Sequence, residues 1–311
     1  MVSPESREYL RRLRETPAFG AGGFDLEGLR MGMATRREPA DPAVRCLAVD
    51  VGRVPGEWVL APGADPDVRL LYLHGGGFVS GSGAFYLPLA AHLSAAAQCA
   101  VLLPDYRLAP EHPFPAGLQD CIHAHAWMVA TGPAGAAPAR ATFIAGDSAG
   151  GGLALSAMLA LRDRQHPLPR AGIALSPFAD LTLSGDSTRS EAGLDPIMDP
   201  RCLPDFVTRY VTKSDVRHPL ASPVFGDYTG LPPLLIQVGE HEIIRDDSVR
   251  VAAKARADGV DVTLEVWEGM FHVFQSHEPL LPEAREAVEH ISAVIRTQGG
   301  GSADLRGRSG R

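Results

Sequence analysis

Short apolar runs alternate with segments of helical periodicity along most of this chain, and that alternation restricts the fold more than any other feature. The runs expected to form strands lie at residues 69–74, 99–104, 141–146, 171–176, 233–239 and 262–267. The helical patterns lie at residues 86–97, directly after residue 148, and at 246–259 and 282–296. Such alternation is typical of an α/β protein whose mostly parallel central sheet has helices on both faces. Two earlier runs, 44–52 and 56–62, predict antiparallel strands at one edge of that sheet.

Three regions do not follow the alternation. Residues 1–43 are charged and interrupted by glycines, and residues 180–230 carry five prolines. We expect both segments to form a helical cap over the carboxyl edge of the sheet, where open α/β sheets bind ligands. The main domain then spans residues 44–296, with 180–230 as a cap insertion. The glycine-rich, polar tail at 297–311 is predicted to be disordered.

The charge balance restricts the partners of the protein. A net charge of −8 over 311 residues provides no basic surface, which argues against binding to nucleic acid or to an anionic membrane. The first residues are polar, and nowhere do about 18 apolar residues run together, as a membrane span requires. We therefore expect a cytoplasmic protein with no membrane span and with a small-molecule partner.

The sequence contains no pattern of a metal or nucleotide site. Neither a zinc-protease helix motif, a phosphate-binding loop nor a dinucleotide fingerprint is present. The four cysteines are far apart, with no C-x-x-C pair, and are expected to be free thiols: Cys46, Cys99, Cys121 and Cys202. The sequence thus predicts neither a metal nor a cofactor.

The pattern G-x-S-x-G occurs once between an expected strand and an expected helix, at residues 146–150, with Ser148 at its centre. In a nucleophile elbow this turn exposes the serine at the top of the sheet, and the following helix directs its backbone N–H groups there. A glycine-rich turn without chemistry is the alternative. Asp147, beside the serine, is expected to secure the turn by hydrogen bonds.

A serine nucleophile needs a base, and the base needs a carboxylate that orients it. His272 follows the last expected strand, whereas His277 lies next to Pro279 and leads into the final helix. A structural histidine is the alternative for His272. Three carboxylates follow the strand at 233–239 and are candidates for the acid: Glu242, Asp246 and Asp247. We rank Glu242 first and Asp246 second, because Asp246 and Asp247 stand where a helix N-terminus favours a carboxylate.

A glycine triplet at residues 75–77 follows the strand at 69–74 directly. Glycines in this position let backbone N–H groups point at the oxyanion that forms during acyl transfer. We expect the N–H groups of Gly75, Gly76 and Ala149 to form the oxyanion hole.

Together these segments resemble the hormone-sensitive-lipase-like bacterial esterases and lipases of the α/β-hydrolase superfamily. The matching stretches are "HGGGF" at 74–78, "DYRLAPEHPFPA" at 105–116, "GDSAGG" at 146–151, "HEIIRDD" at 241–247 and "GMFHVF" at 269–274. The resemblance implies Ser148 as nucleophile, His272 as base and Glu242, thirty residues before it, at the position of the acid. Family members often have Asp there. It also implies that His74 braces the glycine loop and that the 105–116 segment (Asp105, Tyr106, Arg107 and Glu111) is a buried polar brace.

The implied activity is that of a serine carboxylesterase that hydrolyses small, short-acyl esters without a cofactor, with homodimerisation common among similar proteins. The same constellation would serve a lactone hydrolase, an amide deacetylase or a longer-chain lipase. Outside enzymes, a small-molecule-binding protein on a hydrolase scaffold is the alternative. Nothing in the chain resembles the propeller domain of large oligopeptidases.

Overall fold

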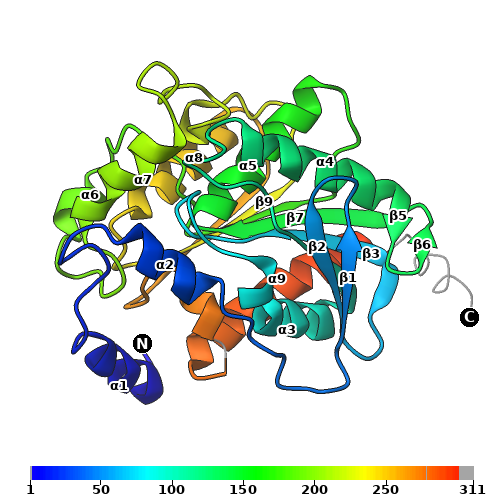
Figure 1. Cartoon of the computed structure of the whole chain (residues 1–311), viewed down its shortest axis with the longest axis horizontal. Coiled ribbons are helices and arrows are strands. Elements are labelled where there is room, and N and C mark those ends of the chain that lie inside the picture. Colours follow the sequence, from blue (N-terminus) through cyan, green and yellow to red (C-terminus); the bar gives the residue numbers. More distant parts are fainter. Residues whose placement is uncertain (1, 278, 301–311) are drawn as a thin grey trace, which may run out of the picture.

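A computed structural model describes residues 2–277 and 279–300, and in this part of the chain eight strands form one sheet (Figure 1). The strands are β1 (Arg45–Asp50), β2 (Pro55–Leu60), β3 (Asp65–Leu73), β4 (Cys99–Pro104), β7 (Ala141–Asp147), β8 (Gly172–Leu175), β9 (Leu234–Gly239) and β10 (Val262–Trp267). Their order is β1-β2-β4-β3-β7-β8-β9-β10. β2 is antiparallel to both neighbours, and all pairs from β4 to β10 are parallel. The predicted α/β class and the antiparallel edge are therefore confirmed.

Helices cover both faces of this sheet, as Figure 1 shows. One face carries α3 (Leu87–Ala97) and α9 (Pro282–Gly299), and the other carries α4 (Ala116–Ala130), α5 (Ala149–Asp163) and α8 (Arg245–Ala257). Side chains alternate between faces along β3. Leu71 and Leu73 pack among the second group of helices, and Leu70 and Tyr72 among the first.

Helix α4 was not predicted from the sequence. Two of its buried side chains, Asp120 and His125, are polar and interrupt the apolar periodicity. Asp120 accepts hydrogen bonds from Arg107, which compensates for the burial of its charge. A two-residue hairpin, β5 (Thr131–Gly132) and β6 (Gly135–Ala136), follows this helix.

The two expected cap segments lie together at one end of the molecule (Figure 1). The first contains α1 (Pro4–Leu13) and α2 (Leu26–Met33), and the second contains α6 (Ser187–Ser190) and α7 (Leu203–Tyr210). Short 3₁₀ turns occur at Gly83–Phe85, Pro200–Cys202, Pro223–Phe225 and Phe274–His277. Phe19 joins the two segments through backbone bonds to Ile197 and Asp199, each 2.8 Å long. The rings of Phe24 and Phe206 meet edge to face at 4.9 Å.

The last helix is longer than predicted. α9 continues through residues 297–299, which the sequence assigns to a disordered tail, so that assignment is wrong for these three residues. Gly299 is buried close to Val68 and Phe143, and this packing extends the helix. The rest of the predicted tail, 301–311, lies outside the described residues. Among the described residues, none of the helices combines the length and apolar character that a bilayer crossing demands.

Candidate active site

Ser148 stands at the turn between β7 and α5 in a strained backbone conformation, with φ of 53° and ψ of −120°. Two glycines make this turn possible by close approach. A Cβ atom on Gly146 would lie 2.4 Å from the Gly150 carbonyl oxygen, and one on Gly150 would lie 2.0 Å from the Leu73 oxygen. Only glycine fits at either position, so the G-x-S-x-G motif forms an elbow that presents Ser148 to a cavity.

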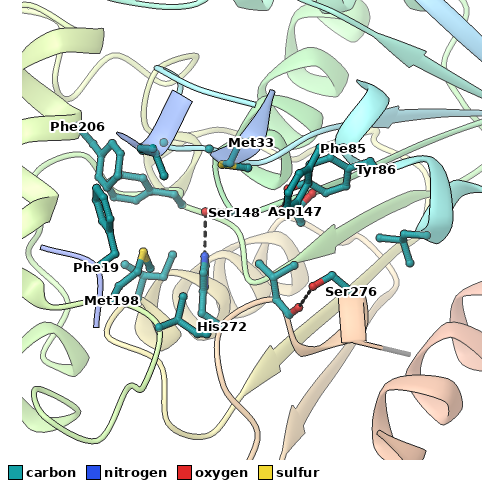
Figure 2. Close-up of a pocket in the computed structure, with 18 of the residues that line it drawn as sticks. Phe19, Met33, Phe85, Tyr86, Asp147, Ser148, Met198, Phe206, His272 and Ser276 are labelled. Carbon is teal, nitrogen blue, oxygen red and sulfur yellow. Dashed lines mark hydrogen bonds between the residues drawn. The ribbon is translucent and has the colours of Figure 1, made fainter. Parts of the chain in front are cut away.

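A continuous chain of hydrogen bonds runs from this serine into the core. The Ser148 Oγ and His272 Nε2 atoms are 2.9 Å apart (Figure 2), and His272 Nδ1 lies 2.9 Å from Glu242 Oε2. The other Glu242 oxygen accepts hydrogen bonds from the Ser176 hydroxyl, at 2.7 Å, and from the Gly239 N–H. The three residues follow β7, β9 and β10, whose carboxyl ends meet at one edge of the sheet.

The surroundings of His272 favour its protonated form. Burial of the imidazole opposes the charge, but the hydrogen bond and the charge of Glu242, together with the charges of Asp195 and Asp147, outweigh burial and raise the pKa of His272. A histidine with a raised pKa is a stronger proton acceptor once it is neutral.

Glu242 is the one of the three candidate carboxylates that contacts His272. Asp246 accepts the Ser187 N–H at 3.0 Å, and Asp247 accepts the N–H groups of Ala179 and Asp180. We expected Asp246 to cap its own helix. Instead, it binds the cap insertion, because residue 187 lies beside the first turn of α8.

Asp147 secures the elbow, as predicted. Its carboxylate accepts hydrogen bonds from the Tyr72 hydroxyl at 2.9 Å, the Tyr86 hydroxyl at 2.8 Å and the Gly75 N–H at 3.1 Å. Burial raises the pKa of Asp147 to about 6, although these donors act in the opposite direction. The carboxylate thus joins β3, the turn before α3 and the nucleophile.

The same contact corrects the predicted oxyanion hole. The Gly75 N–H donates to Asp147 and to the Tyr86 oxygen, so it is directed away from Ser148, and the prediction for Gly75 is wrong. Gly76 and Gly77 line the cavity of Ser148, with positive φ angles of 116° and 62°. From the sequence alone, Gly77 is not assigned to the oxyanion hole. The sequence cannot show which of the three glycine N–H groups already donates a hydrogen bond within the protein.

His74 contacts the glycine loop, whereas most of the polar residues in the 105–116 segment do not contact the site. The His74 Nδ1 atom lies 2.8 Å from the Gly75 oxygen, and its ring stacks on Tyr106, so His74 holds the glycine loop as expected. Tyr106 is buried and donates to the His74 oxygen. Arg107 and Glu111 lie near the surface, in pairs with Asp120 and Arg30. The expected buried brace therefore reduces to Tyr106.

The serine opens into an apolar cavity of about 230 Å³. In the view of Figure 2, Phe19 and Phe206 lie to one side of Ser148, and Phe85 and Tyr86 to the other. Side chains from both cap segments contribute to the lining, among them Leu29, Met33, Met198 and Leu203. Within residues 2–277 and 279–300, no cluster of three or more side chains suited to a metal ion occurs. This fold, with a serine elbow bonded to a histidine, defines the class of α/β-hydrolases.

Comparison with known proteins agrees with this class. A family model described as alpha/beta hydrolase fold matches residues 70–276. An acetyl-hydrolase of Streptomyces hygroscopicus is 44% identical over 252 residues, which cover 81% of this chain and 83% of the relative. EstE5, a protein whose crystal was soaked with p-nitrophenyl butyrate, is 40% identical, with a TM-score of 0.89 over 96% of this chain and 100% of that one. An esterase of the bacterial hormone-sensitive lipase family is 39% identical, with a TM-score of 0.85 and the same coverage. The chain belongs to the alpha/beta hydrolase family and is a carboxylic ester hydrolase of its hormone-sensitive-lipase-like group.

Proposed function

We propose that the protein is a serine carboxylesterase for small, short-acyl esters. Ser148 is the nucleophile, His272 the general base and Glu242 the acid that orients it. The observation that carries this proposal is the unbroken hydrogen-bond chain from Glu242 through His272 to Ser148, which ends in an apolar cavity. The cavity next to Ser148, about 230 Å³ in volume, has room for a short acyl group.

The reaction proceeds in two acyl-transfer steps. His272 Nε2 takes the Ser148 proton as Oγ attacks the ester carbonyl, and the negative charge forms on the carbonyl oxygen. The N–H groups of Gly76, Gly77 and Ala149 form the oxyanion hole, aided by the partial positive charge at the start of α5. His272 then donates the proton to the departing alcohol. Water, deprotonated by His272, then attacks the acyl carbonyl, and His272 returns this proton to Ser148 Oγ as the acid departs.

Glu242 acts through the histidine. Its Oε2 atom accepts a hydrogen bond from Nδ1, which leaves Nε2 free of hydrogen and able to accept the serine proton. The Ser176 hydroxyl and the Gly239 N–H donate hydrogen bonds to its other oxygen. These bonds fix the orientation of the carboxylate toward His272. A glutamate therefore fulfils the role that an aspartate often has in this group.

Removal of acetyl groups bound through nitrogen is a second candidate. It is favoured by the 44% identical relative, whose name, acetyl-hydrolase, does not restrict the linkage to oxygen. Ser148, activated by His272, can attack either carbonyl, and the same oxyanion hole would stabilise the charge that forms.

The test is hydrolysis of p-nitrophenyl acetate, butyrate, octanoate and palmitate, with p-nitroacetanilide to represent amides. We expect turnover of the acetate and butyrate, and a loss of about 10⁴-fold or more in Ser148→Ala. Ser156→Ala is the matched control, because Ser156 is buried in the same helix away from the cavity. A folded Ser148→Ala variant that keeps its rate, or a folded wild-type protein inactive on every ester, would refute the proposal. Preference for the anilide would select the second candidate.

A further inference from the structure

Arg37 lies in the lining of the cavity that contains Ser148 and His272, just beyond the end of α2. Two contacts hold it there. Its backbone N–H donates to the Ala84 oxygen at 3.0 Å, and its guanidinium stacks 3.7 Å above the centre of the Phe85 ring. Phe85 also lines the cavity, and Figure 2 shows its ring close to Tyr86. Arg37 is an exposed residue, and these two contacts hold its guanidinium over the Phe85 ring beside the cavity.

The charge of Arg37 is not matched by a carboxylate. The neighbouring arginines are paired, Arg30 with Glu111 and Arg36 with both Glu38 and Glu57. Among the described residues, by contrast, no Asp or Glu oxygen lies within 4.0 Å of Arg37. Asp147, the acidic residue in the lining, is bonded to Tyr72, Tyr86 and Gly75. Arg37 thus retains donors for a ligand.

An outer groove of about 470 Å³ adjoins the cavity. The two spaces share five lining residues: Phe19, Leu29, Met33, Arg37 and Phe85. Gly28 and Gly32, one turn apart on α2, also line the groove and contribute no side chain to it. Asp25 also lines the groove, but its Oδ1 atom accepts the Gly28 N–H at the start of α2. A substrate that extends from Ser148 toward the groove would therefore lie along this shared lining, to which Arg37 contributes the one cationic side chain.

We propose that Arg37 is a specificity residue that binds a carboxylate at the far end of the substrate, so that the enzyme prefers anionic esters to neutral ones of equal length. The inference rests on the proposed esterase function. A guanidinium presents parallel N–H donors in the geometry that a carboxylate accepts, and stacking on Phe85 fixes the plane of this fork. The apolar lining between Ser148 and Arg37 accommodates the intervening methylene groups.

The experiment compares matched esters by pH-stat titration. Monoethyl esters of dicarboxylic acids with four to eight carbons are paired with ethyl esters of the unbranched acids of equal length. Acetate esters of ω-hydroxy acids place the carboxylate on the alcohol side instead. The quantity is the ratio of kcat/KM for the anionic ester to that for its neutral partner. Arg37→Gln should lower this ratio about tenfold at the best chain length, as expected for one charge-assisted hydrogen-bonded contact. Arg37→Lys should lower it less.

Arg36→Gln is the matched control, because it removes the same charge one residue away from the cavity. It should leave the ratio within about twofold, since Arg36 lines neither the cavity nor the groove, and a charge that acts only across solvent interacts weakly with a bound ester. Equal ratios in wild type, Arg37→Gln and Arg36→Gln at every chain length, in both ester series, would overturn the inference. Ser148-dependent hydrolysis of neutral esters would in that case leave the proposed function intact.

Binding separates the two proposals if no ester is hydrolysed. Calorimetric titration of Ser148→Ala with the monoethyl esters should give tighter binding than the same titration of the Ser148→Ala, Arg37→Gln double variant. A difference of about tenfold in Kd would support the role of Arg37 even where the esterase proposal fails. Equal affinities would refute it.

Discussion

The two sides of the cavity are held together by different forces. On the side of the sheet, buried carboxylates organise the site through short hydrogen bonds, with Asp147 at the elbow and Glu242 behind the histidine. On the side of the cap, Phe19, Phe24 and Phe206 pack ring against ring at 4.9 to 5.9 Å. Hydrogen bonds fix direction, whereas apolar packing tolerates changes of shape. From this difference we expect changes on the side of the sheet to affect the rate of the reaction, and changes on the side of the cap to affect the choice of substrate.

The two sides meet at defined contacts. A Cβ atom on Gly77 would lie 2.1 Å from the Phe206 ring, so the cap packs directly on the proposed oxyanion loop. Asp195, in the cap insertion, accepts the Ile243 N–H at 3.1 Å beside Glu242, and also binds Ile197. Residues of the cap insertion therefore pack on the glycine loop and bind the backbone next to Glu242.

The largest expected effect belongs to Glu242→Gln. The amide can keep the bonds to Ser176 and Gly239, but it offers an N–H group to His272 Nδ1 and thereby favours the wrong tautomer. We expect kcat for p-nitrophenyl acetate to fall about 10³- to 10⁴-fold with little loss of folded protein. Asp246→Asn is the control and should retain nearly full activity, because Asp246 binds Ser187. If Asp246→Asn loses activity and Glu242→Gln retains it, Asp246 is the acid. The carboxylate behind the histidine would then not distinguish the side of the sheet from the side of the cap.

The pH dependence of kcat/KM is the next largest effect. His272 must be neutral to accept the serine proton, so activity should fall about tenfold for each pH unit below its pKa. That pKa is raised, because Glu242, together with the charges of Asp195 and Asp147, outweighs burial, and the midpoint of the acid limb should therefore lie above pH 6.5. The measurement is kcat/KM from pH 5 to 9 at constant ionic strength, with circular dichroism to verify the fold. A midpoint below 6.5 would mean that burial dominates.

The smallest effect tests the cap. Phe206→Ala removes a ring from the cavity wall, so the ratio of octanoate to acetate hydrolysis should rise about fivefold, within the range that one hydrophobic contact contributes. Thermal denaturation should show a loss of stability, because the ring is almost fully buried. Phe225→Ala, an aromatic position outside the cavity lining, is the control. If Phe206→Ala lowers acetate hydrolysis as strongly as Glu242→Gln does, the cap belongs to the chemistry and not only to substrate choice.

The sequence predicted more of the catalytic chain than of its surroundings. Ser148, Glu242 and His272 each follow closely after a segment that the sequence predicts as a strand. In the structure, two hydrogen bonds join the three side chains. Helix α4 was missed, since Asp120 makes its buried face appear polar. Gly75 was assigned to the hole, because three consecutive glycines look alike in sequence. The position of Arg37 over Phe85 has no local signal at all.

By itself, the sequence determined the strands of the central sheet, several of the helices that cover it, and which residues end at the carboxyl edge of the parallel strands. Hydrophobic periodicity and glycine spacing are local properties, so they can be read without the fold. Only the tertiary structure decided which N–H groups remain available and which carboxylate faces the histidine. Those outcomes depend on partners that are remote in the chain. The Gly75 N–H donates a hydrogen bond to Asp147, and the Ser187 N–H donates one to Asp246. A buried polar group needs a hydrogen-bond partner, and the fold decides which group that is. The local sequence around the residue does not identify the partner.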